Sequence, residues 1–240
     1  MAIYAISDLH LALGVEKPMD IFGGKWENYM EKLKIFWQDT VSADDYVIVP
    51  GDISWATYLE DGLRDFEFIN NLPGKKIILK GNHDYWWSTL NKLETFLKNN
   101  GFTTIKFLHN NCYVIEDAVL CGSRGWKCPG DDEFGKEDMK MYNRELQRLE
   151  LSLKCAVKAA ADSDNRIRKI IAALHYMPFN IKKQPSGFVE IMKKYNVNVC
   201  IYGHLHGEGI KNSVEGNIDG IEYFLVSADY LGFKPIRINI

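Results

Sequence analysis

The stretch Lys76-Ile77-Ile78-Leu79-Lys80-Gly81-Asn82-His83-Asp84 decides how this chain is organised. It opens with a short, mostly apolar run between turn residues, and this pattern predicts a buried strand over 76–80. An amide, an imidazole and a carboxylate then follow in a row at Asn82, His83 and Asp84. Such residues are unsuited to a strand interior, whereas loops at strand ends often carry chemistry on a rigid sheet. The stretch therefore predicts a functional loop at the end of a strand.

The same arrangement recurs at four other places in the chain. Each time an apolar, strand-like run ends in Asp or His: the runs 2–7, 45–49, 168–174 and 197–202 lead into Asp8-Leu9-His10, Gly51-Asp52, His175 and Gly203-His204-Leu205-His206. Five of the six histidines lie at these strand ends, and only His109 lies elsewhere. A single histidine is usually structural, but five at matching positions indicate one shared metal centre.

Between these strands, apolar residues recur at helical spacing. The periodicity predicts helices over 26–38, 58–71 and 136–161, with shorter ones after an N-cap at Ser88 and around Phe188. The early alternation of strand and helix favours parallel strands covered by helices. Later β-rich segments separated by turns favour antiparallel hairpins and a second, mixed sheet. These segments are 102–108, 112–116 and 118–122, and segments 221–227 and 235–239 complete the sheet.

The size and charge of the chain indicate its domain number and the kinds of partner that we expect for it. At 240 residues it fits a single large α/β domain spanning 1–240. A net charge of −3 and a pI near 6.1 give no basic surface field, so we expect no strong nucleic-acid binding. We find no targeting signal, and no apolar run approaches the roughly 20 residues that cross a bilayer. We therefore expect a cytoplasmic protein without a membrane partner, in an oligomeric state that the residues do not indicate.

The five cysteines are odd in number, and none of them has CxxC spacing. This pattern argues against a disulfide framework and against a zinc knuckle. We therefore expect reduced, mostly buried thiols at Cys112, Cys121, Cys128, Cys155 and Cys200.

The polar side chains at the strand ends form a hard-to-borderline ligand set without cysteine. Such a set suits Mn, Fe, Zn, Co or Ni better than Ca or a thiolate-bound structural zinc. It is also too large for one ion, since it offers seven side chains: Asp8, His10, Asp52, Asn82, His175, His204 and His206. Two metal ions about 3.5–4 Å apart that share a carboxylate would use them all. Such a pair stabilises both oxygens of an in-line displacement and supplies hydroxide near neutral pH, as phosphoester hydrolysis requires.

In their order along the chain, the five motifs resemble those of the calcineurin-like metallophosphoesterases. They span residues 8 to 206 and are highly specific as a set, although Gly-Asp or one histidine alone would mean little. The resemblance implies an α/β fold, a four-layer α/β/β/α sandwich with two stacked mixed β-sheets flanked by helices. It also implies a dinuclear metal-dependent phosphohydrolase in which a metal-bridging hydroxide attacks a phosphomonoester or a small phosphodiester in line.

The resemblance also assigns roles to the matching residues. Asp8, His10 and His206 would hold the first metal ion, Asn82, His175 and His204 would hold the second, and Asp52 would bridge them. Mn, Fe and Zn are the metals expected at this centre. His83 would face the substrate as a general acid to the leaving oxygen or as a donor to the phosphoryl group. Asp84 would orient His83, and the alternative for Asp84 is a turn or cap residue.

The chain departs from the family pattern after the Asn-His-Asp motif. Many protein-phosphatase members carry an arginine close to this motif, whereas this chain has Tyr85-Trp86-Trp87, which argues against a protein-phosphatase activity. Arg124, in a Gly-rich loop after a strand, is the candidate phosphate-binding cation, since a guanidinium fork matches phosphate oxygens. The alternative is a surface arginine in a flexible loop. The segment 123–162 is a candidate loop-helix insertion over the site.

Three tryptophans, Trp86, Trp87 and Trp126, either stack on a base or an aromatic leaving group or pack as core aromatics. Substrate stacking would suit an alternative function, a nucleotide or nucleic-acid phosphodiesterase (nuclease), although the acidic pI disfavours long polyanions. A non-catalytic binding module on the same fold is a further alternative, but it would be expected to lack ligands, and none is missing here. We expect a phosphorylated small molecule as the substrate.

Overall fold

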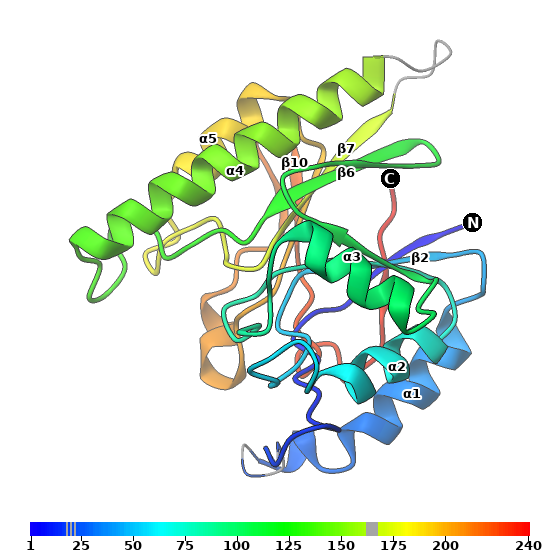
Figure 1. Cartoon of the computed structure of the whole chain (residues 1–240). Helices are drawn as coiled ribbons and strands as arrows, with labels where there is room; N and C mark the ends of the chain where they lie inside the picture. The colour runs from blue at the N-terminus through cyan, green and yellow to red at the C-terminus, as the bar shows by residue number, and fades with distance from the viewer. Residues whose placement is uncertain (18, 20, 22, 162–167) are drawn as a thin grey trace. The chain divides into compact units, whose positions relative to one another are not determined.

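The computed structural model describes residues 1–17, 19, 21, 23–161 and 168–240. The chain divides into two compact units. The first comprises Met1–Phe107 with Val226–Asn239, and the second comprises Leu108–Leu225 with Ile240. Figure 1 labels the main helices and several strands of both units. A single domain over 1–240, with 123–162 as an insertion over the site, stays a prediction.

The first unit contains a five-stranded sheet of β11 (Ile236–Arg237), β1 (Ile3–Ala5), β2 (Tyr46–Val49), β3 (Lys75–Leu79) and β4 (Ile105–Leu108), in that order. The first three strands along the chain, β1, β2 and β3, pair in parallel, and β11 runs antiparallel to β1. Most residues of β2 and β3 are buried, so each strand reads as a continuous apolar run and not as an alternating one. The parallel arrangement expected for the first part of the chain is therefore confirmed.

Three helices contribute to the core of the first unit: α1 (Tyr29–Thr40), α2 (Leu63–Asn71) and α3 (Leu90–Asn99). Each helix is amphipathic and buries one apolar stripe. Trp37 of α1, Phe66 of α2 and Leu93 of α3 are completely shielded from solvent and belong to one core cluster. A 3-10 turn, η2 (Gly24–Trp26), precedes α1.

Helix starts differ from their predicted positions. The helix expected over 26–38 begins at Tyr29, because Asn28 takes a left-handed conformation with φ of 53° and separates it from the preceding 3-10 turn. The residue before α3 is Thr89 in an extended conformation, so Ser88 is not the N-cap. Apolar periodicity located these helices, whereas their first residues depend on local backbone conformation.

Lys76, near the start of β3, is completely buried. Its ammonium group donates to the main-chain carbonyls of Leu72 at 2.6 Å and Gly74 at 2.8 Å, just beyond the end of α2. Carbonyl groups at a helix C-terminus lack intrahelical donors and carry partial negative charge. Burial lowers the pKa of Lys76 to about 8. Lys76 thus ties the end of α2 to the strand that precedes the Asn-His-Asp loop.

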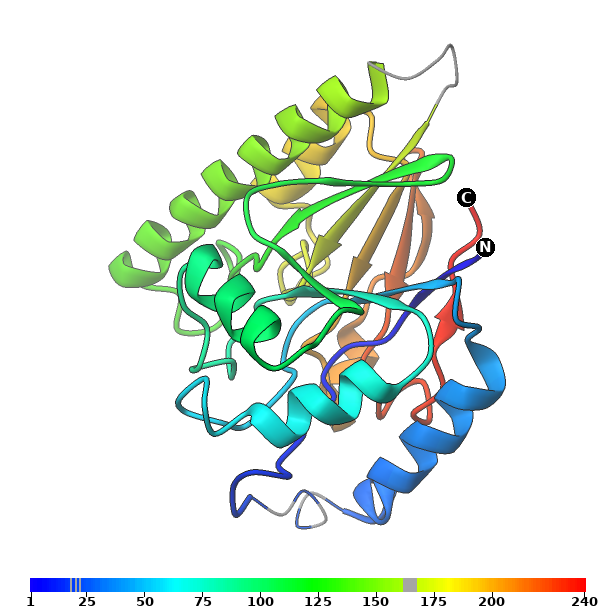
Figure 2. The same cartoon turned by 45° about the vertical axis from the view of Figure 1, so that its right-hand side comes forward.

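The second unit contains a six-stranded sheet of β5 (Tyr113–Ile115), β6 (Ala118–Ser123), β7 (Lys169–Leu174), β8 (Val199–Tyr202), β10 (Ile221–Leu225) and β9 (Gly216–Ile218), in that order. The four inner strands pair in parallel, and the two outer strands pair antiparallel to their neighbours. Figure 2 shows the inner strands as a row of arrows running from green to orange. The carboxyl ends of β7 and β8 therefore lie side by side.

Two helices, α4 (Lys136–Ala161) and α5 (Gly187–Lys194), lie along this sheet (Figure 2). The bounds predicted for α4 are confirmed, and the helix buries Tyr142, Leu149 and Leu153 in a second core cluster. A 3-10 helix, η3 (Gly207–Asn212), follows β8. Each helix in the described ranges is too short or too polar to cross a bilayer.

The α/β class, with two mixed sheets flanked by helices, is confirmed. The predicted hairpin structure is right only in part. β5 and β6 pair antiparallel, but β4 lies beside β3 in the sheet of the first unit. Only a short turn separates β4 from β5, so the sequence alone resembles a continuous meander. Which sheet a short apolar strand joins depends on distant partners that its own residues do not reveal.

The prediction of five reduced thiols is wrong for two of them. Cys112 and Cys155 form a disulfide with their Cα atoms 5.8 Å apart, although 43 residues separate them in sequence. The pairing arises because α4 packs against β5 and β6 and brings Cys155 close to Cys112. Cysteine count and spacing do not reveal a pair that tertiary structure creates. The other three cysteines are free and buried, as predicted: Cys121, Cys128 and Cys200.

Candidate metal centre

Three of the predicted metal ligands lie together in the first unit. Asp8 and His10 follow β1, and Asp52 follows its parallel neighbour β2. A carboxylate oxygen of Asp8 lies within 4.8 Å of a ring nitrogen of His10 and within 4.8 Å of a carboxylate oxygen of Asp52. His10 Nε2 is 3.8 Å from Asp52 Oδ2, and all three residues are buried. Two buried carboxylates this close repel each other unless a cation compensates them, so the group fits a metal site.

The main chain at these ligands adopts an uncommon conformation. Asp8, His10 and Asp52 have φ values of 58°, 47° and 52°, in the left-handed region. This region costs a residue other than glycine about 1–2 kcal/mol, and such strain is concentrated at functional sites. Main-chain hydrogen bonds hold the two loops in this form, from Asp8 to the carbonyl of Gly51 and from His10 to that of Asp52, both at 3.0 Å.

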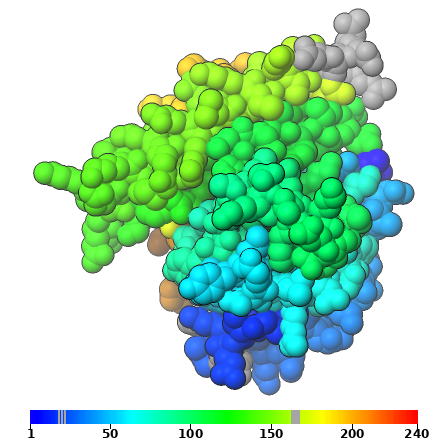
Figure 3. Space-filling model, viewed as in Figure 1, coloured from blue at the N-terminus to red at the C-terminus, as the bar shows by residue number. Residues whose placement is uncertain are grey.

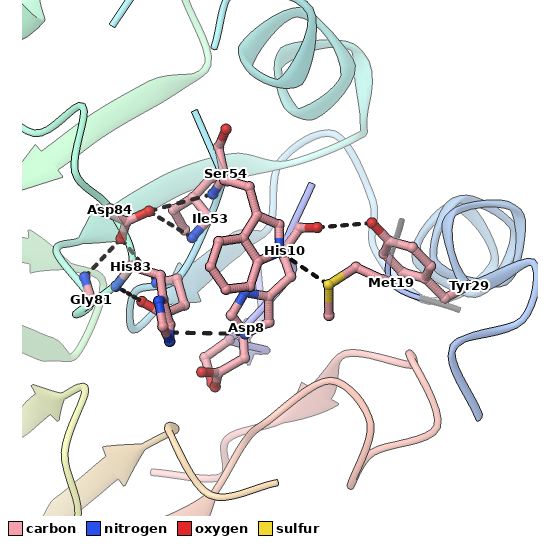
Figure 4. A network of polar contacts seen from close by, with 12 residues as sticks. Asp8, His10, Met19, Tyr29, Ile53, Ser54, Gly81, His83 and Asp84 are labelled. Atoms are coloured by element: carbon pink, nitrogen blue, oxygen red, sulfur yellow. Dashed lines mark hydrogen bonds and ion pairs between the residues drawn. The ribbon is translucent and has the colours of Figure 1, made fainter. Parts of the chain in front are cut away.

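Hydrogen bonds from neighbouring side chains also hold Asp8 and His10. The hydroxyl of Tyr29 donates to the carbonyl of His10 at 2.9 Å (Figure 4). Burial raises the pKa of Tyr29, so this hydroxyl keeps its proton. The hydroxyl of Ser7 donates to the carboxylate of Asp8. Both predicted ligands are therefore oriented before any metal binds.

His83 lies beside His10, with their ring centroids 5.7 Å apart. The ring of Trp55 lies against both, 4.9 Å from His10 and 4.5 Å from His83. The main-chain N–H of His83 donates to Asp52 Oδ1 at 2.8 Å. Asn82, directly before it, is half-buried. Trp55 was not predicted as part of the site, although its position in the loop that begins with Asp52 was an available signal.

Asp84 has different partners from those expected. Figure 4 shows its buried carboxylate between the Gly81 loop and the segment that includes Ile53 and Ser54. It accepts hydrogen bonds of 2.7–3.4 Å from the main chain of Gly81, Asp52, Ile53 and Ser54 and from Trp86 Nε1. The pKa of Asp84 is raised to about 6, because burial raises it by more than the main-chain hydrogen bonds lower it. Its hydrogen bonds in the described residues do not reach the His83 ring, so Asp84 joins the loop after β3 to the loop after β2.

Gly81 lies where these two loops touch. A Cβ atom at this position would lie 2.1 Å from Asp52 Oδ1 and 2.3 Å from the main-chain nitrogen of Asp52. Since no larger residue fits without moving Asp52, the glycine of the Gly-Asn-His-Asp stretch is required by packing.

The other three histidines predicted as metal ligands lie in the second unit. His175 follows β7, and His204 and His206 follow the parallel neighbour β8. The ring centroids of His175 and His204 are 5.0 Å apart. His204 has φ of 72°, so a fourth predicted ligand takes the left-handed conformation. His206 is the N-cap residue of η3 and is half-buried.

The loop around His175 is fixed by its own main chain. The N–H groups of His175 and Tyr176 both donate to the carbonyl of Arg124 at 3.0 Å, and Gly203 donates to the carbonyl of His175 at 3.1 Å. The ring of Tyr176 also lies 4.1 Å from that of His204. Tyr176 was not singled out from the sequence, and its position directly after His175 was the only signal.

The side chain of Arg124 is directed toward α4. Its guanidinium lies 4.4 Å from the ring centroid of Trp126, and Nη2 is 3.4 Å from Oε1 of Glu145. Burial lowers the pKa of Arg124, and the carboxylate of Glu145 raises it. Trp126 Nε1 donates to Asp138 at 3.1 Å. The alternative of a surface arginine is therefore wrong, and substrate binding by Arg124 and Trp126 stays a prediction.

Trp86 is a core residue, only 3% exposed, and packs edge-to-face on Phe66 with ring centroids 5.0 Å apart. Trp87 is partly buried and packs against the same core cluster. The core alternative is thus confirmed for Trp86, which has no face free for a base.

The comparison with known families agrees with this arrangement of motifs. The model of the calcineurin-like phosphoesterase family matches residues 1–208, and the chain belongs to this family. Proteins of this family normally bind a dinuclear metal centre, and the candidate ligand groups described above are of the kind that such a centre needs. The chain is therefore a metal-dependent phosphohydrolase.

Solved structures share the fold. A phosphopantetheinyl hydrolase from Mycobacterium tuberculosis is 12% identical with a TM-score of 0.56, and the match covers 99% of this chain and 95% of that one. The protein TT1561 from Thermus thermophilus is 14% identical with a TM-score of 0.51, and the match covers 99% of this chain and 97% of that one. At these identities the likeness shows the fold alone. No curated protein matches the chain in sequence.

Proposed function

We propose that this phosphohydrolase uses two metal ions and acts on a phosphomonoester or a small phosphodiester. The observation that supports this most directly is the buried group of Asp8, His10 and Asp52, in which two carboxylates lie within 4.8 Å of each other. A buried pair of like charges needs a compensating cation. Oxygen and imidazole ligands without thiolates fit Mn, Fe or Zn.

Asp8, His10 and His206 would hold one ion, Asn82, His175 and His204 would hold the other, and Asp52 would bridge them. Bound there, the ions would neutralise developing charge on the phosphoryl oxygens and supply a nucleophile near neutral pH.

The chain's own residues would position and protonate the substrate. His83 lies beside His10 and would donate a proton to the leaving oxygen. Its main chain is fixed by Asp52, and Asp84 holds the loops of both residues together. Trp55 packs against both imidazole rings and limits their movement. His83 would thus act from a fixed place.

Hydrolysis of aryl phosphates by the full chain tests the proposal. After loading with Mn, Fe or Zn, we expect turnover of p-nitrophenyl phosphate or bis-p-nitrophenyl phosphate that a chelator abolishes. Asp52→Asn should lower kcat/KM about 100-fold and reduce the bound metal found by elemental analysis. Asp39→Asn, on the exposed face of α1, is the matched control. No turnover of either ester with any of these metals, or a fully active Asp52→Asn variant, would contradict the proposal.

The same assay decides between monoester and diester substrates. A nucleotide or nucleic-acid phosphodiesterase would favour the diester and would use exposed aromatic rings for stacking. Because Trp86 is buried in the core, one of the rings on which this alternative relied is not available. A monoester or a small diester is therefore the favoured substrate.

A further inference from the structure

Glu145, in the first half of α4, lies among three arginine side chains. Its own side chain is 1% exposed. Its Oε1 is 2.8 Å from Nη1 of Arg148, 3.4 Å from Nη2 of Arg124 and 3.7 Å from Nε of Arg144. These three arginines around Glu145 form an arginine cluster. One carboxylate neutralises only one of three guanidinium charges, so the cluster carries two positive charges in excess.

Within the described ranges, the guanidinium groups of the cluster form few hydrogen bonds to the protein: Arg124 and Arg148 each donate one to Glu145. Each guanidinium has five N–H donors. Among the described residues, the three arginines form ion pairs with Glu145 and with no other acidic side chain. Arg124 Nε is buried, and it has no hydrogen-bond partner among the residues that the structure describes. A buried, unused donor beside excess positive charge indicates a place for an anionic ligand.

A purely structural role would not require all three arginines. Arg124, only 11% exposed, already supplies one buried positive charge 3.4 Å from Glu145 Oε1. The side chains of Arg144 and Arg148 are 49% and 36% exposed, so both guanidinium groups reach solvent beside the buried carboxylate of Glu145. These two lie one turn apart on α4, whose outer surface faces solvent in Figure 3. Their convergence on one carboxylate therefore points to a ligand.

The cluster adjoins the loop of a proposed metal ligand in the same unit. The carbonyl of Arg124 accepts the main-chain hydrogen bonds of His175 and Tyr176. The guanidinium of Arg124 is held over the ring of Trp126. Arg124 thus contacts the His175 loop through its main-chain carbonyl and belongs to the arginine cluster through its guanidinium.

We propose that the arginine cluster binds a second phosphate group of the substrate. The inference rests on the proposed function and narrows the substrate to phosphoesters with a phosphate besides the one that is hydrolysed. A phosphate monoester carries about −1.5 to −2 charges at neutral pH, which matches the excess positive charge. Guanidinium forks bind phosphate through paired N–H···O hydrogen bonds. Glu145 acts as a positioning residue that draws the three forks toward one point.

Calorimetric titration of the metal-loaded full chain with inorganic phosphate tests the cluster. We expect two phosphate ions per chain, one at the metal ions and one at the cluster. The double variant Arg144→Gln/Arg148→Gln should lose the phosphate at the cluster. Lys154→Gln/Lys158→Gln removes two positive charges at the same spacing from exposed positions of the same helix and should bind phosphate like the wild type. Equal phosphate binding by the arginine variant and the wild type overturns the proposal.

Chelation separates this inference from the proposed function. A chelator should remove the phosphate at the metal ions and leave the phosphate at the cluster. If the metal centre were misassigned, the chelator would change nothing, and the arginine variant would still lose one phosphate. The two proposals therefore fail in different arms of the experiment.

A matched pair of inhibitors tests the substrate class. Adenosine 3′,5′-bisphosphate and adenosine 5′-monophosphate differ only in the second phosphate. As inhibitors of p-nitrophenyl phosphate hydrolysis, the bisphosphate should bind about tenfold more tightly to the wild type. The arginine variant should lose this preference, whereas the lysine variant should keep it. A preference that is the same in wild type and arginine variant, or absent from both, overturns the proposal.

Discussion

Gly81 separates the Asn-His-Asp loop from Asp52, and an added Cβ would lie 2.1 Å from Asp52 Oδ1. Gly81→Ala should displace this carboxylate, lower kcat/KM about 100-fold and destabilise the chain by about 1–3 kcal/mol. Aryl phosphate hydrolysis and urea unfolding measure the two effects. Gly135→Ala, whose Cβ would meet nothing closer than 3.8 Å, is the control. A Gly81→Ala variant with wild-type activity would show that the loops can move apart freely.

His83 gives the second prediction at the residue scale. Because it would donate a proton and not bind metal, His83→Ala should lower kcat about 10²- to 10⁴-fold and retain the metal content. Kinetics at saturating metal, together with elemental analysis, check both statements. His109→Ala, a half-buried histidine outside the motifs, should leave both values unchanged. Loss of the metal ions from His83→Ala would instead make His83 a ligand.

Some residues of the candidate site could be found from sequence and others could not. Asp8, His10 and Asp52 were predictable because each ends a recognisable apolar run, and parallel pairing brings such ends together. Two partners of Asp84 were not predictable, because they are the main-chain N–H groups of Asp52 and Ile53. Helix α2 and strand β3 separate these residues from Asp84 in the sequence. Every residue except proline carries a main-chain N–H, so residue types do not indicate which of these groups will donate to a given side chain.

At the scale of the element, Lys76 couples α2 to β3 and makes stability depend on pH. Its pKa in the folded chain is about 8, below the ordinary value of 10.5. Between these pH values the unfolded chain holds a proton that the folded chain has released, so this group makes folding more favourable as pH rises. Below pH 8 the buried charge weakens the fold.

Lys76→Met removes this dependence and leaves the carbonyls of Leu72 and Gly74 without their donor. We expect a loss of about 1–3 kcal/mol in unfolding free energy. Urea titrations at pH 7.5 and 9.5 should show a larger loss at the higher pH. Lys92→Met, at an exposed position of α3, controls for general charge effects. A loss that does not change with pH would contradict the assignment.

The Cys112–Cys155 disulfide links the residue before β5 to α4 and joins positions that are 43 residues apart in sequence. Reduction should lower the unfolding free energy by about 2–4 kcal/mol. Urea unfolding with and without dithiothreitol measures this change, and Cys112→Ala should be insensitive to the reductant. Thiol titration of the unfolded, unreduced chain should find three free thiols, because two of the five cysteines are paired. Five free thiols would rule the disulfide out.

Element positions followed from the sequence better than element partners did. The bounds of α4 were predictable because its apolar residues keep helical spacing over its whole length. β9 (Gly216–Ile218) was missed, because it is short, half exposed and contains glycine. The strand β4 was found, but its sheet was not, since strand pairing depends on the whole chain.

For the whole molecule, metal binding should couple to stability. Ions that bind only the folded chain stabilise it by about 2.7 kcal/mol at a hundredfold excess over Kd, which corresponds to roughly 5–10 °C in Tm. Differential scanning calorimetry of chelated and Mn-, Fe- or Zn-loaded protein measures the shift. Asp52→Asn should lose most of it, whereas Asp39→Asn should keep it. An unchanged Tm with every metal would count against a resident metal centre.

The order of motifs along the chain, from residue 8 to residue 206, was enough to predict the family, because a set of spaced motifs is far more specific than any member. The arginine cluster could not be predicted in this way. Arg124 and Glu145 are separated in sequence and meet only because α4 packs on β6. Charges that meet through packing are visible only in the folded chain.

The left-handed backbone at Asp8, His10, Asp52 and His204 has a consequence for how this protein can vary. Asparagine and glycine adopt this conformation most easily, and β-branched residues adopt it least. A mutational library sorted for soluble expression would therefore enrich asparagine and glycine at these positions and deplete valine and isoleucine. The same library sorted for catalysis would return aspartate and histidine. Heritable loss of activity with an intact fold is thus one nucleotide change away at both aspartates, since Asp and Asn codons differ by a single base.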